Sequence, residues 1–174
     1  MNVIVSCSLN SDSNSRVLAR EAQRILEADG QPVTWLDLRD HALPLCDGAV
    51  SYAHPSVGPV SEILTKASAI LIATPIYNYD GTAAVKNLIE LTGGSWNGKV
   101  VGFLCAAGGM SSYMSIMSLA NSLMLDFRSI IVPRFVYATG DAFTGGRITD
   151  PEQQRRVAEL ARTAARMGQL LLAA

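Results

Sequence analysis

Five short apolar runs recur along the chain, and segments with helical periodicity separate them. Runs that are apolar throughout are typical of strands buried on both faces, as in a parallel sheet covered by helices. The alternation therefore predicts an α/β fold with a central parallel sheet. We expect the strands at Asn2–Ser6, Val33–Asp37, Ala69–Ala73, Val100–Ala106 and Ser129–Tyr137.

Local signals predict a helix after each strand. Ser15 can cap the first helix, Gly30 can end it, and Pro151 suits the first position of the last one. The other helices are expected at Val57–Ala67, Thr82–Leu91 and Tyr113–Leu125. Strict alternation favours a doubly wound sheet with helices on both faces, for which we take the common strand order 2-1-3-4-5. With 174 residues and no linker segment, we expect one domain over residues 1–174.

Composition excludes several classes of function. The net charge is −1 without a basic block, so nucleic acid is not an expected partner. No segment approaches the roughly 20 apolar residues of a membrane span, and no signal peptide is apparent. The three cysteines form no Cys-x-x-Cys pair, which fits a reducing cytoplasm and argues against a zinc site. His41 and His54 lack acidic neighbours at metal-ligand spacing, and we expect no metal.

A polar loop follows the first expected strand. Hydroxyl groups, side-chain amides and the free N–H groups of a helix start can together bind a phosphate dianion. The candidates are Ser8, Asn10, Ser13, Asn14 and Ser15, with Arg16 as a potential charge partner. The alternative is an ordinary polar turn with a helix cap, where serine and asparagine are common.

Two further loops follow the third and fourth strands. In a sheet of this order, ligands bind beyond the carboxyl ends of the strands where the order reverses, which is between the first and third strands. The segment Thr74–Gly81 contains a proline and two tyrosines that can cover a planar ring, and Gly108 and Gly109 permit close backbone approach. A ligand with a phosphate and a flat ring, such as flavin mononucleotide (FMN), would use all three loops.

The second loop carries a recognisable pattern. Pro75-Ile76-Tyr77-Asn78-Tyr79, then Gly81 and Val85-Lys86-Asn87, resembles the NADPH-dependent FMN reductase family. The resemblance implies a flavodoxin-like three-layer fold, bound FMN, and NADPH or NADH as co-substrate. One departure lies in the first loop, where family members often have Gly-Ser and then Arg but this chain has Cys7-Ser8 and then Asn10.

The resemblance also implies which residues contact the cofactor. No catalytic side chain is expected, because FMN itself carries the chemistry. The alternative is that these are ordinary loop residues and that the glycines only turn the chain. The expected FMN-binding residues are Ser8, Asn10, Ser13, Asn14, Ser15, Pro75, Ile76, Tyr77, Asn78, Tyr79, Ala107, Gly108, Gly109 and Ser112.

The expected reaction passes hydride from a reduced nicotinamide to FMN and then to a small-molecule acceptor by ping-pong exchange. The acceptor could be a quinone, an azo compound or a free flavin. Two alternatives remain: a flavodoxin-type electron carrier, which would normally be more acidic, and a flavin-binding regulatory protein. The resemblance further implies a homodimer or homotetramer, and the methionine-rich stretch Met110–Leu125 could pack across such an interface or within the core.

Overall fold

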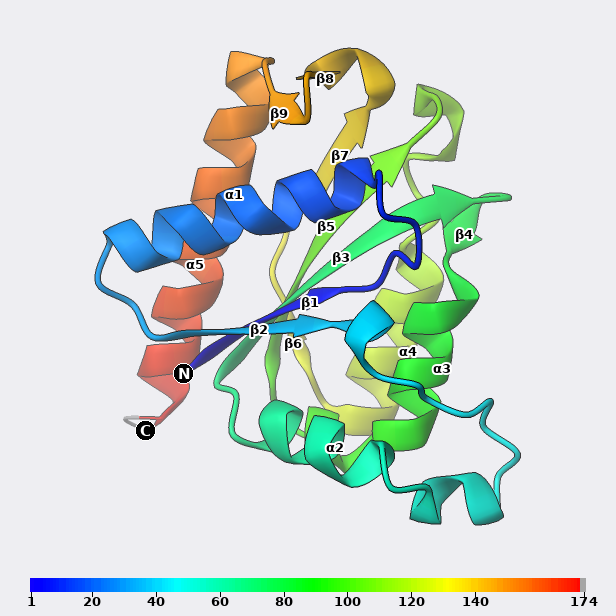
Figure 1. Ribbon diagram of the computed structural model, residues 1–174. Helices are drawn as coiled ribbons and strands as arrows, with labels where there is room; N and C mark the ends of the chain where they lie inside the picture. The colour runs from blue at the N-terminus through cyan, green and yellow to red at the C-terminus, as the bar shows by residue number, and fades with distance from the viewer. Residues whose placement is uncertain (173–174) are drawn as a thin grey trace.

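The computed structural model describes residues 1–172 and has a central sheet between two layers of helices (Figure 1). The main strands lie in the order β2-β1-β3-β5, followed by β6 and β7, and all of these pair in parallel. Counted along the chain as five main strands, this is the predicted order 2-1-3-4-5. The strands span Asn2–Ser6 (β1), Val33–Asp37 (β2), Ala69–Tyr77 (β3), Val100–Ala107 (β5), Ile130–Ile131 (β6) and Val136–Thr139 (β7).

Three details of the sheet differ from the prediction. The strand predicted at Ala69–Ala73 continues as β3 to Tyr77, so Pro75, Ile76 and Tyr77 lie in a strand and not in the predicted loop. A short strand β4, Asp80–Gly81, pairs antiparallel with the end of β3, so the sheet is not purely parallel. The single strand predicted at Ser129–Tyr137 is wrong, because it is broken between β6 and β7. Pro133 has no N–H for the sheet, and Arg134 takes a left-handed backbone with φ of 60°.

Helices cover both faces of the sheet (Figure 1). One apolar core joins α1 and α5 to one face, and a second joins α2, α3 and α4 to the other. Successive strand residues serve opposite cores: Val3 and Val5 face one, and Ile4 faces the other. This is a flavodoxin-like three-layer fold. The helices span Asn14–Ala28 (α1), Val57–Thr65 (α2), Ala83–Thr92 (α3), Met117–Phe127 (α4) and Pro151–Leu172 (α5).

The segment before α4 also differs from the prediction. The helix was expected from Tyr113 but begins at Met117, after a 3₁₀ turn at Met110–Ser112 and further turns. Serines at 111, 112 and 115 explain the late start, because serine hydroxyls compete for backbone hydrogen bonds. Residues 108–116 therefore form a loop at the edge of the sheet rather than the first turn of a helix.

The segment between β2 and α2, residues 38–56, is hydrogen-bonded to α3. The Asn87 side chain donates to the carbonyl oxygen of Pro44 and accepts from the N–H of Cys46, each at 2.8 Å. Asn87 therefore links α3 to the loop that contains Pro44 and Cys46. Within the described residues, no helix combines the length and apolar character needed to cross a bilayer.

Candidate functional site

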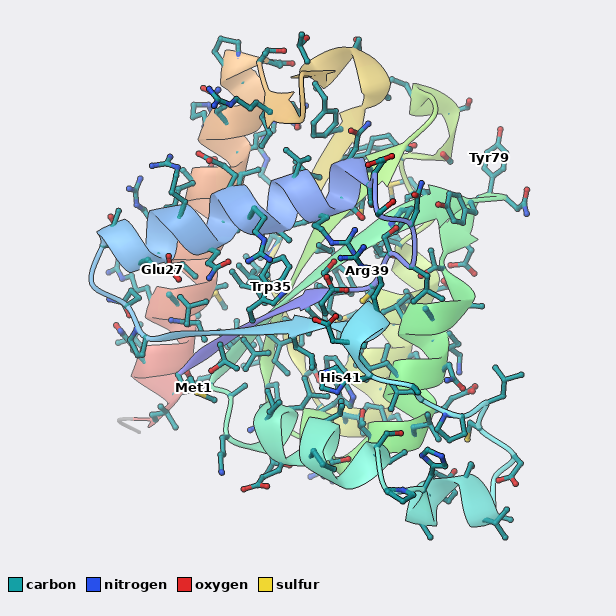
Figure 2. The ribbon with its side chains drawn as sticks, in the orientation of Figure 1. Met1, Glu27, Trp35, Arg39, His41 and Tyr79 are labelled. Atoms are coloured by element: carbon teal, nitrogen blue, oxygen red, sulfur yellow. The ribbon has the colours of Figure 1, made fainter. Side chains whose placement is uncertain are left out.

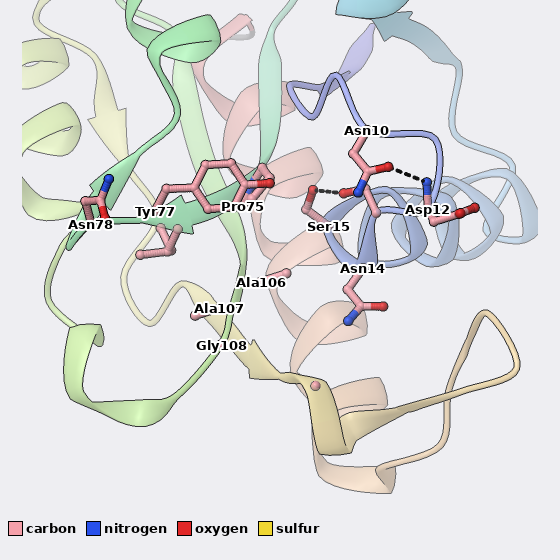
Figure 3. A pocket seen from close by; sticks show the side chains of 13 residues that line it. Asn10, Asp12, Asn14, Ser15, Pro75, Tyr77, Asn78, Ala106, Ala107 and Gly108 are labelled. Atoms are coloured by element: carbon pink, nitrogen blue, oxygen red, sulfur yellow. Dashed lines mark hydrogen bonds between the residues drawn. The ribbon is translucent and has the colours of Figure 1, made fainter.

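A cavity of about 700 Å³ opens at the carboxyl ends of β1, β3 and β5. Small-molecule sites are typically of this size. The first loop forms one wall, the end of β3 forms the opposite wall, and the end of β5 lies between them (Figure 3). The lining residues are Asn10, Asp12, Ser13, Asn14, Ser15, Pro75, Ile76, Tyr77, Asn78, Ala106, Ala107, Gly108 and Gly140.

Most of the predicted site residues line this one cavity, although they come from three segments that lie far apart in the sequence. Four do not: Ser8, Tyr79, Gly109 and Ser112. Three lining residues were not predicted: Asp12, Ala106 and Gly140. Asp12 lies in the first loop, Ala106 is the last residue of the predicted fourth strand, and Gly140 directly follows β7, so positions at the ends of strands were the available signal.

The first loop presents hydrogen-bond donors at the start of α1. Ser13 precedes the helix without a side-chain cap, and its Oγ lies 2.8 Å from Oγ of Ser15. The first turn of any helix leaves N–H groups without partners in the helix. Hydroxyls, the Asn14 amide and these N–H groups form a donor set that suits a phosphate dianion. The N–H of Asp12 donates instead to Oδ1 of Asn10 at 3.1 Å (Figure 3).

Two of the predicted residues, Ser8 and Tyr79, lie outside the cavity lining for different reasons. Ser8 is buried, and its Oγ accepts from the N–H of Asn10 at 3.3 Å. Tyr79 is 67% exposed and extends into solvent at the tip of the hairpin between β3 and β4 (Figure 2). Both Asn78 and Tyr79 have positive φ, 50° and 64°, as a two-residue hairpin of the mirror-image type requires. The hairpin fixes the end of β3, where Tyr77 borders the cavity with 57% of its surface exposed.

The third loop contains two glycines that nothing in the chain itself requires. A Cβ built on Gly108 or Gly109 would meet no atom within 4 Å, and neither residue has a positive φ. Because Gly108 lines the cavity, a side chain there would enter the cavity space. The glycine thus leaves room for a flat ligand against the backbone.

Tyr137 holds this third loop from behind. Its hydroxyl donates to the carbonyl oxygen of Gly109 at 2.6 Å and lies 2.6 Å from Oγ of Ser112. Tyr113 stacks on Phe135 and meets Tyr137 edge-on. Gly109 and Ser112 are therefore absent from the cavity lining because they are bound to a buried tyrosine.

Arg16 points away from the cavity. Its guanidinium pairs with Asp37 at 3.1 Å, and within the described residues the cavity lining contains no lysine or arginine. Burial alone would raise the pKa of Asp37, but hydrogen bonds from Arg16 and Arg39 outweigh burial and leave the pKa lowered. The expectation that Arg16 supplies a charge partner inside the cavity is therefore not met.

The remaining candidates for reactive chemistry have structural roles. Cys7 is fully buried, and burial, with a smaller contribution from Asp37, raises the pKa of its thiol. Trp96 is buried and donates to Oγ1 of Thr92 at 2.8 Å, while Trp35 lies under the guanidinium of Arg20. His54 contacts Oγ of Ser56. Across residues 1–172, no three His, Cys, Asp or Glu side chains gather closely enough to hold a metal ion.

Comparison with known proteins gives consistent matches. Residues 2–144 match the family model of the NADPH-dependent FMN reductases. The chain is 34% identical over 145 residues to an NAD(P)H-dependent FAD/FMN reductase of Geobacillus thermodenitrificans, covering 81% of this chain and 77% of that protein.

Solved structures share the fold at low sequence identity. The flavoenzyme FerB of Paracoccus denitrificans, an NAD(P)H:acceptor oxidoreductase, superposes with a TM-score of 0.78 at 20% identity, covering 97% of this chain and 96% of that one. RosB, solved with a bound formylated riboflavin phosphate intermediate, gives a TM-score of 0.81 at 16% identity, covering 98% and 79%.

Proposed function

Because this chain belongs to the NADPH-dependent FMN reductase family, and is therefore an NAD(P)H-dependent oxidoreductase that uses FMN, we propose that FMN binds in the cavity at the ends of β1, β3 and β5. The observation that carries this assignment is the meeting of three loops around one cavity. One wall offers phosphate donors at a helix start, and the opposite wall offers Pro75 and Tyr77. Gly108, between them, leaves room for a flat ring.

Each wall has its own part in the proposed binding mode. The side chains of Asn10, Ser13, Asn14 and Ser15, with the N–H groups of the α1 start, hold the phosphate. Pro75, Ile76, Tyr77 and Asn78 face the ring, and Ala107 and Gly108 lie along its edge. Ser8, Gly109 and Ser112 lie behind the residues that line the cavity, and Tyr79 lies at the opening of the cavity. FMN supplies the hydride chemistry when it is bound.

The nicotinamide and the final acceptor use the same open face in turn. The exposed Tyr77 and the opening of the cavity to solvent support this arrangement. The expected acceptors are small oxidised molecules such as quinones, azo compounds or free flavins. Alternate occupation predicts ping-pong kinetics, with parallel lines in double-reciprocal plots; intersecting lines would overturn the shared site.

The test is the visible absorbance spectrum of the purified protein, before and after FMN is added and then after NADPH is added without oxygen. The expected result is a bound-flavin spectrum that bleaches with NADPH and returns when a quinone is added. Bound flavin that stays oxidised would instead support an electron carrier or a sensor. A protein that retains no flavin at all would overturn the proposed site.

The chain is further proposed to form a homodimer or homotetramer in the cytoplasm. Large apolar side chains are exposed on and near α4, including Met114 at 60% and Leu125 at 85%. Exposed apolar surface of this kind is typical of protein–protein contacts. Light scattering that gives a monomer mass at micromolar concentration would contradict the oligomer.

Two buried, unpaired cysteines, Cys7 and Cys105, support a reducing compartment.

A further inference from the structure

The guanidinium of Arg16 uses all five of its N–H donors. Nε and Nη2 donate to the two carboxylate oxygens of Asp37, each at 3.1 Å. The other hydrogens of Nη2 and Nη1 reach backbone carbonyl oxygens of the first loop: Ser8 at 2.9 Å, Asn10 at 2.5 Å and Ser11 at 3.2 Å. Five donors meet five acceptors, which is the full capacity of an arginine side chain.

This arrangement is more than an ion pair between α1 and β2. The side chain of Arg16 is 12% exposed and that of Asp37 is 3% exposed, so the pair lies almost out of solvent. A pair that served only to join the two elements would need two of the five donors. The other three fix the backbone of residues 8–11, the loop that leads from β1 to the cavity.

The direction of the fixed carbonyl groups matters for an anion. A carbonyl oxygen carries partial negative charge and repels a phosphate, whereas N–H and O–H groups attract it. Three carbonyl groups of the loop point at Arg16, which does not line the cavity. The lining of this wall consists instead of Asn10, Asp12 and Ser13–Ser15, most of which carry side-chain donors.

The charge of Arg16 is partly balanced by Asp37, whose carboxylate also lies 3.6 Å from Nη2 of Arg39. Asp37 accepts from Arg16 on both oxygens, and the N–H of Arg39 donates to its Oδ1 at 3.1 Å. A guanidinium paired in this way contributes little net field at a distance, since the carboxylate beside it cancels most of its charge. The geometry of the loop, rather than attraction by a free cation, is then what Arg16 provides.

We propose that Arg16, held by Asp37, is the positioning residue of the phosphate loop, which keeps the carbonyl groups of Ser8, Asn10 and Ser11 turned toward its own guanidinium and so away from a bound phosphate monoester. This inference rests on the proposed function, because it concerns how the same cavity holds the phosphate of FMN.

The test compares FMN with riboflavin, which has the same ring but no phosphate. Arg16→Lys keeps the charge but replaces the planar five-donor fork by one ammonium group that cannot reach both the carboxylate and three carbonyl groups. The matched control is Arg24→Lys, on the exposed face of the same helix, where Arg24 pairs only with Glu21. Dissociation constants come from flavin fluorescence quenching with the flavin-free protein.

The expected result is selective for the phosphate. Arg16→Lys should weaken FMN binding about tenfold, the equivalent of roughly one lost charged hydrogen bond, and should leave riboflavin within about twofold. Arg24→Lys should change neither constant. Unchanged FMN affinity in Arg16→Lys would overturn the inference, as would an equal loss for both flavins, which would indicate general disruption.

Asp37→Asn provides a second test. The rival explanation, attraction of the phosphate by the charge of Arg16, predicts the opposite change in FMN affinity. If Arg16 acted by its charge, removing the balancing carboxylate would strengthen FMN binding. If Arg16 acts by position, the loss of its holder should weaken FMN binding about threefold or more and spare riboflavin. Stronger FMN binding would therefore overturn the inference. A wild-type protein that binds riboflavin and FMN equally would also overturn it, while one that binds neither would overturn the proposed function itself.

Discussion

At the scale of single residues, the cavity is shaped by side chains that do not line it. Tyr137 is 2% exposed, and its hydroxyl holds Gly109 and Ser112 in the third loop. Arg16 does the same for the first loop. In both cases a buried polar group binds backbone carbonyl oxygens, which fixes the direction of the neighbouring N–H groups. Such residues determine loop shape without touching a ligand.

Tyr137→Phe tests the anchor of the third loop. Loss of the hydroxyl removes the donor to Gly109 and should cost about 1 kcal/mol of unfolding free energy. In the proposed binding mode the loop borders the ring, which FMN and riboflavin share, so both should bind about threefold to tenfold more weakly. Fluorescence titration and urea unfolding measure the two effects.

The control for this prediction is Tyr52→Phe. The hydroxyl of Tyr52 lies 3.7 Å from Sγ of Cys46, in the segment after β2 and outside the cavity lining. It should leave both flavin affinities unchanged. A loss in Tyr137→Phe confined to FMN would contradict the assignment of this loop to the ring.

The sequence predicted the lining better than it predicted the anchors. Asn10, Ser13 and Pro75 were recognisable because polar residues or proline directly follow buried strands. Arg16 was misjudged, because its partner Asp37 lies 21 residues away and no spacing rule connects them. Tyr137 was placed correctly in a strand, but an apolar pattern shows that a tyrosine is buried and not what its hydroxyl binds.

At the scale of elements, two glycines set how closely α5 packs on the sheet. A Cβ on Gly102 in β5 would lie 2.8 Å from Leu71 and 3.2 Å from Leu160, both side chains. A Cβ on Gly168 in α5 would lie 3.0 Å from the backbone of Ser68 and 3.1 Å from Cβ of Ala69. Side-chain ends can move aside, but a backbone at the start of a central strand cannot.

Gly168→Ala is therefore expected to destabilise the protein. Alanine gains up to about 1 kcal/mol over glycine in a helix interior, but overpacking costs roughly 1–3 kcal/mol. Because the neighbour is backbone, we expect the overpacking to prevail with a net loss of about 1–2 kcal/mol in urea unfolding. The control is Arg166→Ala, on an exposed position of the same helix, which should stay within about 0.5 kcal/mol. Greater stability in Gly168→Ala would show that α5 can shift outward.

The boundaries of elements were the least predictable feature at this scale. The break between β6 and β7 had a signal, since Pro133 lies inside the apolar run, and proline is excluded from the interior of a paired strand. The late start of α4 was harder to see, because the periodic pattern of methionines continues back through the serine-rich turn. Hydrogen bonds of Ser112 with Tyr137, and of Ser115 with the Ser112 carbonyl oxygen, hold this segment in turns instead of a helix.

At the scale of the whole molecule, the sheet separates two apolar cores, and this parallel, helix-covered architecture followed from the apolar runs, whereas the strand order was taken from a common doubly wound arrangement. That inference succeeded because a strand buried on both faces has a distinctive composition and because chain connections favour neighbouring strands. Charged groups lie outside these cores and mostly pair with one another. Several carboxylates have lowered pKa values: hydrogen bonds from charged partners lower those of Glu21, Asp29, Asp37, Glu62 and Glu152, and neutral hydrogen-bond donors lower that of Asp47.

These shifts predict a loss of stability in acid. A carboxylate whose pKa is lower in the folded state stabilises the protein above its unfolded pKa and loses this effect as the pH falls through the folded pKa. The Ser51 hydroxyl and the N–H groups of Ala49 and Ser51 lower the pKa of Asp47 to about 2. The urea midpoint should therefore fall steadily between about pH 5 and pH 2.

Asp47→Asn isolates one of these groups. The variant should unfold at lower urea than wild type near pH 7, and the gap should narrow as the pH approaches about 2, where the wild-type carboxyl is itself protonated. Urea unfolding followed by circular dichroism at several pH values measures the gap. A gap that stays constant over this range would show that size and shape, rather than charge, account for the effect of Asp47.

The glycines of this chain fall into two groups with different evolutionary meaning. Gly102 and Gly168 are demanded by the packing of the chain on itself, so selection for folding alone would preserve them. Gly108 and Gly109 have open space around them and unrestricted backbone angles, so a library screened only for stability would tolerate larger residues there. Because Gly108 lines the cavity proposed for FMN, selection for flavin binding would keep that glycine. Sequence variation at Gly102 and Gly168 on one side, and at Gly108 on the other, would thus record the history of the fold and the history of the function separately.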